Sequence, residues 1–297
     1  TTRIDLAGRT VVAGLIDGHA HMDREGLKRR LPSLLGAGSI ADIQDRIAAL
    51  ARDAAPGEWI VTMPIGTPPE YRDVPECLAE GRFPDRFELD EAAPDNPVYI
   101  RAIWGHWRNT LPLISSANSR ALALAGINRD TLPPVPGIEI EKDAKTGEPT
   151  GRLIEEIYKP VVEHTLMAVA PGFDAEDRVA GLRRSMAIYN AYGTTSVFEG
   201  HGIAGEVLAA YRTLREEGPL PVRAHLVFSP SWRATDGDEI RRLLQSWGRS
   251  LAGRGLGDEY LRMGGLYTES EYTPLNLIRA KTAPYTAWAG FNYDACL

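Results

Sequence analysis

Two histidines separated by one residue close the first apolar stretch of the chain. The stretch runs from Val11 to Asp23 and reads Val-Val-Ala-Gly-Leu-Ile-Asp-Gly-His-Ala-His-Met-Asp. Side chains alternate between the two faces of a strand, so we expect His19 and His21 on one face and Ala20 on the other. Two neutral imidazoles at a strand end supply half of a tetrahedral or five-coordinate metal site. The alternative is a hydrogen-bonded pair of core histidines.

A second group of candidate ligands lies at the end of another predicted strand, over residues 194–199. Glu199 ends this strand and His201 follows it. A carboxylate there can ligate or bridge a metal at the same edge of the sheet as the histidine pair. The alternatives are a carboxylate that bonds neighbouring backbone and a histidine without a ligand role. His164 and His225 have no motif around them, and we expect structural roles for both.

The composition is that of a soluble globular enzyme. The 297 residues are 43% hydrophobic and 25% charged, enough for one large domain or two modest ones. The net charge of −7 and the lack of a dense Lys/Arg cluster argue against nucleic acid as a partner. Two cysteines are too few for a disulfide framework, and no apolar run is long enough to span a membrane. We therefore expect a cytoplasmic protein.

The pattern of elements changes along the chain. Residues 30–170 lack a regular alternation of helix and strand patterns and contain many prolines and glycines. Within this region we expect a capped helix that begins at Ser39 and a loop over residues 127–151. From Asp174 onward, helices and strands alternate, which predicts parallel β/α units. Four strands of one parallel sheet are expected, over residues 13–19, 194–199, 222–228 and 261–268.

The apolar strand followed by Asp, Gly and His-x-His resembles the first barrel strand of the amidohydrolase superfamily. Further matches, in order, are similar to one branch, the amidohydrolase family 3 (YtcJ-like) enzymes. They are Glu58-Trp59-Ile60, the Leu89-Asp90 that precedes Pro97-Val98, Gly105-His106, Asn118-Ser119 and the segment 147–151.

The resemblance implies a (β/α)₈ TIM barrel of which this chain holds the first half. Residues 1–12 would end a small β-sandwich, and residues 13–29 and 171–297 would form the half-barrel. Residues 30–170 would be a large insertion after strand one that covers the barrel mouth. A complete barrel has eight strands in about 250 residues. With its strand edges at 13–19 and 261–268 exposed, the half-barrel is expected either as a fragment or with a second chain that supplies the other strands.

The resemblance also implies a metal site and a substrate pocket. His19, His21 and Glu199 are the metal ligands expected in this chain, and zinc or another divalent ion is the expected cofactor. His106, Trp107 and Asn118 are the expected substrate contacts, although Asn118 also has the features of a helix cap. The catalytic aspartate of the superfamily would lie on a later strand, outside this chain. Tyr267 stands near the position of a metal-bridging lysine, which puts a standard two-metal site in doubt.

These features together predict a metal-dependent hydrolase. A divalent ion lowers the pKa of a bound water and polarises a carbonyl group, so the expected reaction is cleavage of a C–N bond in an amide, formamide or cyclic amide. Hydrolysis of an ester is one alternative. The other is a non-catalytic half-barrel that serves as a scaffold or regulatory subunit and needs a partner chain.

Overall fold

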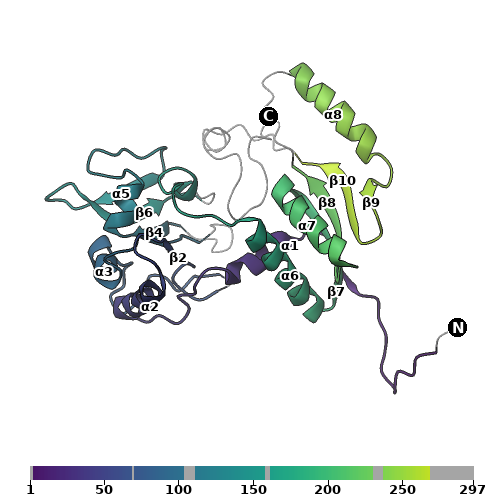
Figure 1. Ribbon diagram of the computed structural model, residues 1–297, viewed down its shortest axis with the longest axis horizontal. Helices are drawn as coiled ribbons and strands as arrows, with labels where there is room; N and C mark the ends of the chain where they lie inside the picture. The colour runs from purple at the N-terminus through teal and green to yellow at the C-terminus, as the bar shows by residue number, and fades with distance from the viewer. Residues whose placement is uncertain (1–2, 69, 104–110, 158–160, 230–236, 268–297) are drawn as a thin grey trace. The chain divides into compact units, whose positions relative to one another are not determined.

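The computed structural model describes residues 3–68, 70–103, 111–157, 161–229 and 237–267. These residues form two compact units, each with its own β-sheet (Figure 1). The first unit comprises residues 3–27 and 174–267, and the second comprises residues 28–173. None of the helices in the described part is long and apolar enough to cross a membrane.

The first unit is built on a five-stranded sheet with the order β1-β7-β8-β10-β9. Four strands are parallel neighbours in chain order: β1 (Leu15–Asp17), β7 (Thr194–Ile203), β8 (Arg223–Phe228) and β10 (Leu261–Leu266). The fifth strand, β9 (Leu256–Gly257), pairs with β10 in the antiparallel direction. The four strands expected from the sequence therefore lie side by side in one mainly parallel sheet, in a mixed α/β fold.

Two helices cover one face of this sheet. α6 (Ala175–Ala191) begins as predicted at Asp174, whose carboxylate accepts a hydrogen bond from the backbone N–H of Asp177. α7 (Gly205–Glu217) connects β7 to β8, and α8 (Gly237–Leu251) connects β8 to the β9–β10 pair (Figure 1). Alternation of helix and parallel strand produces this arrangement.

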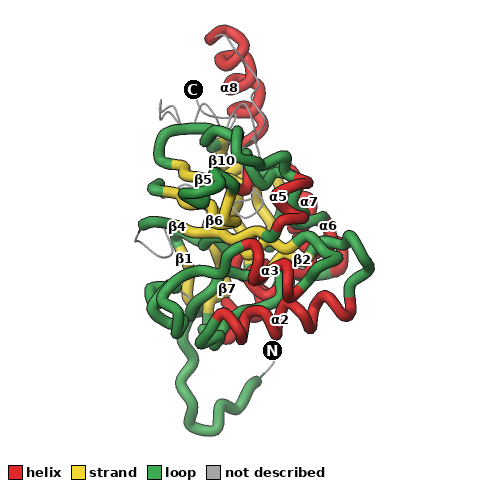
Figure 2. The backbone as a smooth tube through the Cα atoms, turned by 90° about the vertical axis from the view of Figure 1, so that its left-hand side faces the viewer, coloured by secondary structure: helices red, strands yellow, loops and turns green. Residues whose placement is uncertain are grey.

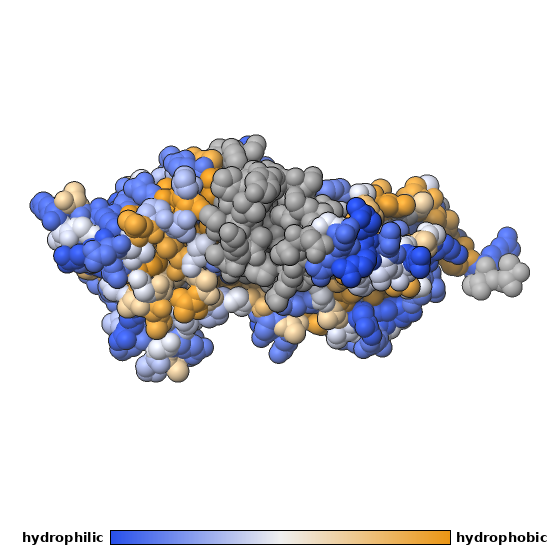
Figure 3. All heavy atoms as spheres, turned by 90° about the horizontal axis from the view of Figure 1, so that it is seen from above, coloured by the Kyte–Doolittle hydropathy of each residue, from blue (hydrophilic) through white to orange (hydrophobic). Residues whose placement is uncertain are grey.

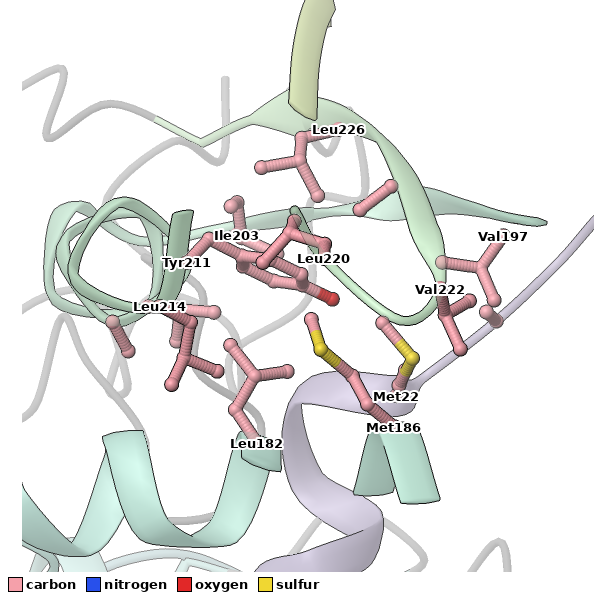
Figure 4. Packing of buried hydrophobic residues seen from close by; sticks show 14 residues of the cluster. Met22, Leu182, Met186, Val197, Ile203, Tyr211, Leu214, Leu220, Val222 and Leu226 are labelled. Carbon is pink, nitrogen blue, oxygen red and sulfur yellow. The ribbon is translucent and has the colours of Figure 1, made fainter. Parts of the chain in front are cut away.

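The core of the first unit lies between the sheet and helices α6 and α7. The short helix α1 (Met22–Glu25) follows β1, passes into the 3₁₀ turn of Gly26–Arg29, and contributes Met22 to this core. Figure 4 shows the Tyr211 ring among these side chains, with its hydroxyl oxygen directed toward Met22 and Met186. All three residues are at most 1% exposed. The segment that carries the histidine pair is thus anchored by apolar burial immediately after the pair.

The second unit has its own five-stranded sheet with the order β2-β3-β4-β6-β5. β2 (Ile60–Thr62) and β3 (Val98–Ile100) are parallel. The remaining pairs are antiparallel and join β3 to β4 (Leu113–Ala117), β4 to β6 (Pro149–Glu155) and β6 to β5 (Ile138–Lys142). Figure 2 shows β4 and β6 as adjacent yellow strands.

Three α-helices belong to the second unit: α2 (Ile40–Asp53), α3 (Arg86–Ala92) and α5 (Ser119–Leu124). The predicted cap of α2 is present, because the Ser39 side chain accepts a hydrogen bond from the N–H of Asp42. Ile43 and Ile47, one helical turn apart in α2, are completely buried. The position of this unit over a barrel mouth stays a prediction.

Two expectations about local structure are wrong, and a third stays a prediction. Residues 3–10 are exposed and pair with no described strand, so their place at the end of a small β-sandwich stays a prediction. Residues 127–151, expected to be a loop, contain β5 and the start of β6, which form an antiparallel hairpin. The exposed edge expected at residues 261–268 is bordered by β9.

Apolar side chains reach the surface around β1. Leu15 and Ile16 are 60% and 75% exposed, and Val11 and Val12 just before them are 70% and 80% exposed. Figure 3 shows hydrophobic surface interspersed with hydrophilic residues on the face in view. Because β1 is also the edge strand of its sheet, this segment exposes both apolar side chains and unpaired backbone groups.

Candidate metal centre

His19 and His21 lie side by side just beyond the end of β1. Their ring centroids are 5.1 Å apart and the ring planes are nearly perpendicular, at 87°. Two backbone hydrogen bonds fix the turn that carries them. The N–H of His19 donates to the Asp17 carboxylate at 3.0 Å, and the N–H of the buried Ala20 donates to the carbonyl of Phe198 at 2.9 Å. The second bond ties the histidine segment to β7, so both candidate ligands stand at the carboxyl edge of the parallel sheet.

His201 joins this pair from the end of β7. Its ring centroid is 5.6 Å from that of His21 and 6.5 Å from that of His19. The ring of Tyr267, the residue that directly follows β10, has its centroid 4.9 Å from that of His201. Three imidazoles from two neighbouring strand ends are therefore gathered at one place.

A buried pair of carboxylates lies close to His21. Oε1 of Glu199 accepts hydrogen bonds from the backbone N–H of Asp23 at 3.0 Å and from the Tyr211 hydroxyl at 2.9 Å. Glu199 and Asp23 are each 2% exposed. One ligand atom each of His21, Asp23 and Glu199 lie within 4.8 Å of one another, and the structure places no other such trio among the residues it describes.

Two atoms in this trio are buried without a hydrogen-bond partner. They are Nδ1 of His21 and Oδ2 of Asp23. Buried polar atoms are nearly always satisfied in folded proteins, so two such atoms without a partner in one trio of side chains indicate groups that engage each other or an ion in the working protein. This arrangement brings the predicted ligands His21 and Glu199 together, whereas His19 lies outside the trio and is solvent-exposed.

Burial controls the charge states of these groups. Burial and, next, the positive charge of Arg24 lower the pKa of His21 to about 3, so its imidazole is neutral at neutral pH. Burial and the nearby charge of Asp23 raise the pKa of Glu199 to about 8. Burial raises the pKa of Asp23 as well, against the opposing effects of Arg24 and Arg178.

Two buried arginines balance the carboxylates. Nε of Arg24 lies 3.4 Å from Oδ1 of Asp23, and Arg178 of α6 is 2% exposed. Two guanidinium groups beside two carboxyl groups leave no net negative charge at the acid pair. A buried dication needs an excess of negative or neutral donors, so the acid pair is better suited to support His21 than to enclose an ion by itself.

The imidazoles fit a divalent metal ion. Nitrogen ligands must be neutral to bind, which the burial of His21 ensures. Nδ1 of His21 is buried, and the side chain lies beside two acidic groups, which is the usual setting of a metal-ligating histidine. The chain thus provides imidazole nitrogens that can bind an ion, and the acidic side chains of Asp23 and Glu199 lie beside one of these imidazoles.

Asn118 has a structural role, and its predicted contact with substrate is not retained. The side chain is fully buried and caps α5 by accepting a hydrogen bond from the N–H of Ala121. Its oxygen also accepts from the N–H of Val98, and its nitrogen donates to the carbonyls of Asn96 and Ala93. All donors and acceptors of the amide are occupied by the protein. The other expected substrate contacts, His106 and Trp107, lie outside the described residues.

Asp23 is the functional candidate that reading the sequence did not single out. It stands two residues after His21, at the same spacing that separates the two histidines. Its contact with Glu199 joins residues 176 positions apart. In the sequence, only this repeated spacing pointed to Asp23. Its contact with Glu199 could not be predicted, because that contact depends on how β1 and β7 pair.

The sequence of this chain is similar to a family model and to several known proteins. The sequence model described as "Amidohydrolase family" matches residues 2–296. N-substituted formamide deformylase of Arthrobacter pascens is 32% identical over 157 residues, which are 51% of this chain and 25% of that protein. Protein LONG AFTER FAR-RED 3 of Arabidopsis thaliana is 28% identical over 67% of this chain and 30% of its own length.

A third curated relative is the exoenzymes regulatory protein AepA of Pectobacterium carotovorum, which is 26% identical over 75% of this chain and 44% of its own length. Among solved structures, an uncharacterized metal-dependent hydrolase from Pyrococcus horikoshii matches 88% of this chain and 43% of its own, with a TM-score of 0.51 and 20% identity. The chain thus spans less than half the length of each of these proteins, and the structural match shows a shared fold.

Proposed function

Because the chain belongs to the amidohydrolase family, we propose that it carries part of a divalent metal centre that hydrolyses a C–N bond. His19 and His21 hold the ion in this proposal, and zinc is the first candidate because it favours imidazole nitrogen. The observation that carries the proposal is the pair of imidazoles, 5.1 Å apart, at the carboxyl edge of a parallel sheet. Active sites of β/α barrels lie at that edge.

A bound divalent ion supplies Lewis-acid activation of water and of a carbonyl group. The residues of this chain position the ligands for that chemistry. The Asp17 carboxylate and the backbone of Phe198 fix the turn on which the histidines stand. Glu199 is held by Tyr211 and by the backbone of Asp23, so that the acid pair lies beside His21. In this proposal Glu199 does not bind the ion but holds the ligand His21 in its orientation.

The proposed substrate is an amide, a formamide or a cyclic amide. The relative from Arthrobacter pascens is named for deformylation of N-substituted formamides, which breaks a C–N bond, and this favours an amide over an ester. The aspartate that would accept a proton from the attacking water is proposed to come from strands beyond this chain, supplied by the rest of a longer protein or by a second chain. The half-barrel arrangement is part of the same proposal.

A non-catalytic role is the second candidate. One relative is named an exoenzymes regulatory protein. Tyr267 also stands near the position at which the resembled enzymes carry a metal-bridging lysine, and a phenol cannot form the carbamate that such a bridge requires. A regulatory protein of this fold would keep the sheet without needing the metal.

Metal binding by purified variants tests the proposal. The protein is stripped with a chelator and titrated with Zn²⁺, and binding is measured by calorimetry and by metal analysis after dialysis. We expect wild type to retain zinc, and His19→Ala and His21→Ala to lose it. His225→Ala is the matched control, because His225 is an exposed histidine of the neighbouring strand β8. Absence of retained zinc in the wild type, or its retention in both ligand variants, would overturn the proposal.

A further inference from the structure

The three ring centroids at the sheet edge have the spacing of a metal tripod. A tetrahedral ion with imidazole nitrogens at about 2.0–2.1 Å places the ring centroids about 5 Å apart. The observed separations are 5.1 Å, 5.6 Å and 6.5 Å for the three pairs among His19, His21 and His201. The centroid is the relevant measure, because it lies close to the Cβ–Cγ axis and moves little when the ring turns about its soft χ2 torsion.

An irregularity in β7 delivers His201 to this position. The pairing of β7 with β8 shifts register between Glu199 and Ile203. Glu199 points to the core and is 2% exposed, and Ile203 is buried again, whereas His201 between them is partly exposed. A regular strand would place residues 199 and 201 on the same face. The bulge therefore turns His201 out of the core and toward the histidine pair.

Gly202 allows a second strand to support the His201 ring. Its φ angle is +82°, and a Cβ atom there would lie 2.6 Å from Cβ of Tyr267. Without that atom, Tyr267 approaches closely and its ring lies 4.9 Å from the His201 ring at 40°. The ring of Tyr267 thus limits the positions that the His201 imidazole can take.

We propose that His201 is the third protein ligand of the metal centre, so that this chain alone supplies a three-histidine face with an open position. The inference rests on the proposed function and extends it, because it assigns a ligand to the second strand of the sheet. Three neutral imidazoles plus one open position form a recurrent catalytic zinc arrangement. Tyr267 acts as a positioning residue that packs on His201, and the acid pair supports His21.

Substitution of His201 by a potential thiolate ligand gives a direct readout. Co²⁺ replaces Zn²⁺ in such sites and shows an intense near-ultraviolet charge-transfer band when a thiolate binds it. We expect Co²⁺-loaded His201→Cys to show this band. We expect neither the wild type nor His225→Cys to show it, although both also carry Cys77 and Cys296. A band requires direct coordination at residue 201, which a packing role would not produce.

The affinity of His201→Ala provides the second measurement. We expect it to bind Zn²⁺ at least about 100-fold more weakly than wild type, since loss of a ligand exceeds the 10–100-fold effect of an outer partner. Circular dichroism of the metal-free variant checks folding. If Co²⁺ binds folded His201→Cys without the band, or if His201→Ala binds Zn²⁺ as wild type does, the assignment of His201 is wrong while the proposed function stands. If wild type binds neither ion, both are wrong.

Discussion

At the scale of single residues, the site combines an exposed ligand and a buried one with different supports. His19 is exposed and held through its backbone by Asp17, whereas His21 is partly buried beside Asp23 and Glu199. The sequence made the histidine pair visible because its spacing is local. His201 was also a candidate from the sequence, but its place beside the pair depends on how the strands pair, and the acid at residue 23 emerged only from the three-dimensional arrangement.

Glu199→Gln tests whether Glu199 supports a ligand or is itself one. Glutamine keeps an oxygen that accepts from Tyr211 and Asp23 but cannot ionise, so it removes the negative charge that Glu199 can supply beside His21 when a metal ion binds. We predict Zn²⁺ affinity 10–100-fold below wild type, as for other outer-layer carboxylates. Glu216→Gln, a change on the exposed surface of α7, is the control and should bind as wild type. A loss as complete as that of His21→Ala would instead make Glu199 a direct ligand, and no loss would remove it from the site.

The metal-free protein is predicted to lose stability between about pH 6.5 and 8. Burial raises the pKa of Glu199 from 4.5 to about 8, so the folded state holds a proton that the unfolded state releases, and stability falls as pH rises through this range. The lowered pKa of His21 acts in the opposite direction, but only below its ordinary value of 6.5, where stability falls as pH decreases.

Thermal melting in the presence of chelator measures this effect. The melting temperature of wild type should decrease from pH 6.5 to pH 8.5, and the decrease should be smaller for Glu199→Gln, which cannot ionise. Parallel pH dependence in the two proteins would show that Glu199 is already ionised in the folded metal-free state.

At the scale of elements, periodicity predicted the strands and helices that have one buried face. α2 and α6 were recognised from their caps and apolar spacing, and both begin at the predicted residue. β4 was missed because two serines, Ser115 and Ser116, occupy buried positions that the pattern reserves for apolar residues. β5 was missed because prolines precede it. Its first three residues nevertheless alternate between buried and exposed, as in a half-buried strand.

Asn118→Ala tests the structural role assigned to this residue. The change removes the cap of α5 and leaves buried groups of Val98 and Asn96 without partners. We predict a loss of about 2–3 kcal/mol in the free energy of unfolding and no change in Zn²⁺ affinity. Asn128→Ala, in an exposed turn, should cost less than about 1 kcal/mol. Chemical denaturation measures both, and an unchanged stability for Asn118→Ala would contradict the assignment.

At the scale of the whole molecule, the sheet of the first unit holds four parallel strands in chain order, and its edge strand β1 carries exposed apolar side chains. The chain spans less than half the length of the relatives it matches. We therefore propose that further strands, from the same longer protein or from a second chain, pair beside β1 and complete the catalytic residues. The sequence indicated this organisation through its motifs, whereas the pairing of strands had to come from the structure.

The metal's own surroundings test the central claim most directly. X-ray absorption at the zinc edge of the loaded protein reports the ligand atoms and identifies imidazoles by their outer-shell scattering. We predict nitrogen ligands at about 2.0–2.1 Å from the zinc ion, with at least two imidazoles in wild type and fewer in His21→Ala. A shell of oxygen or sulfur without imidazole scattering would contradict it.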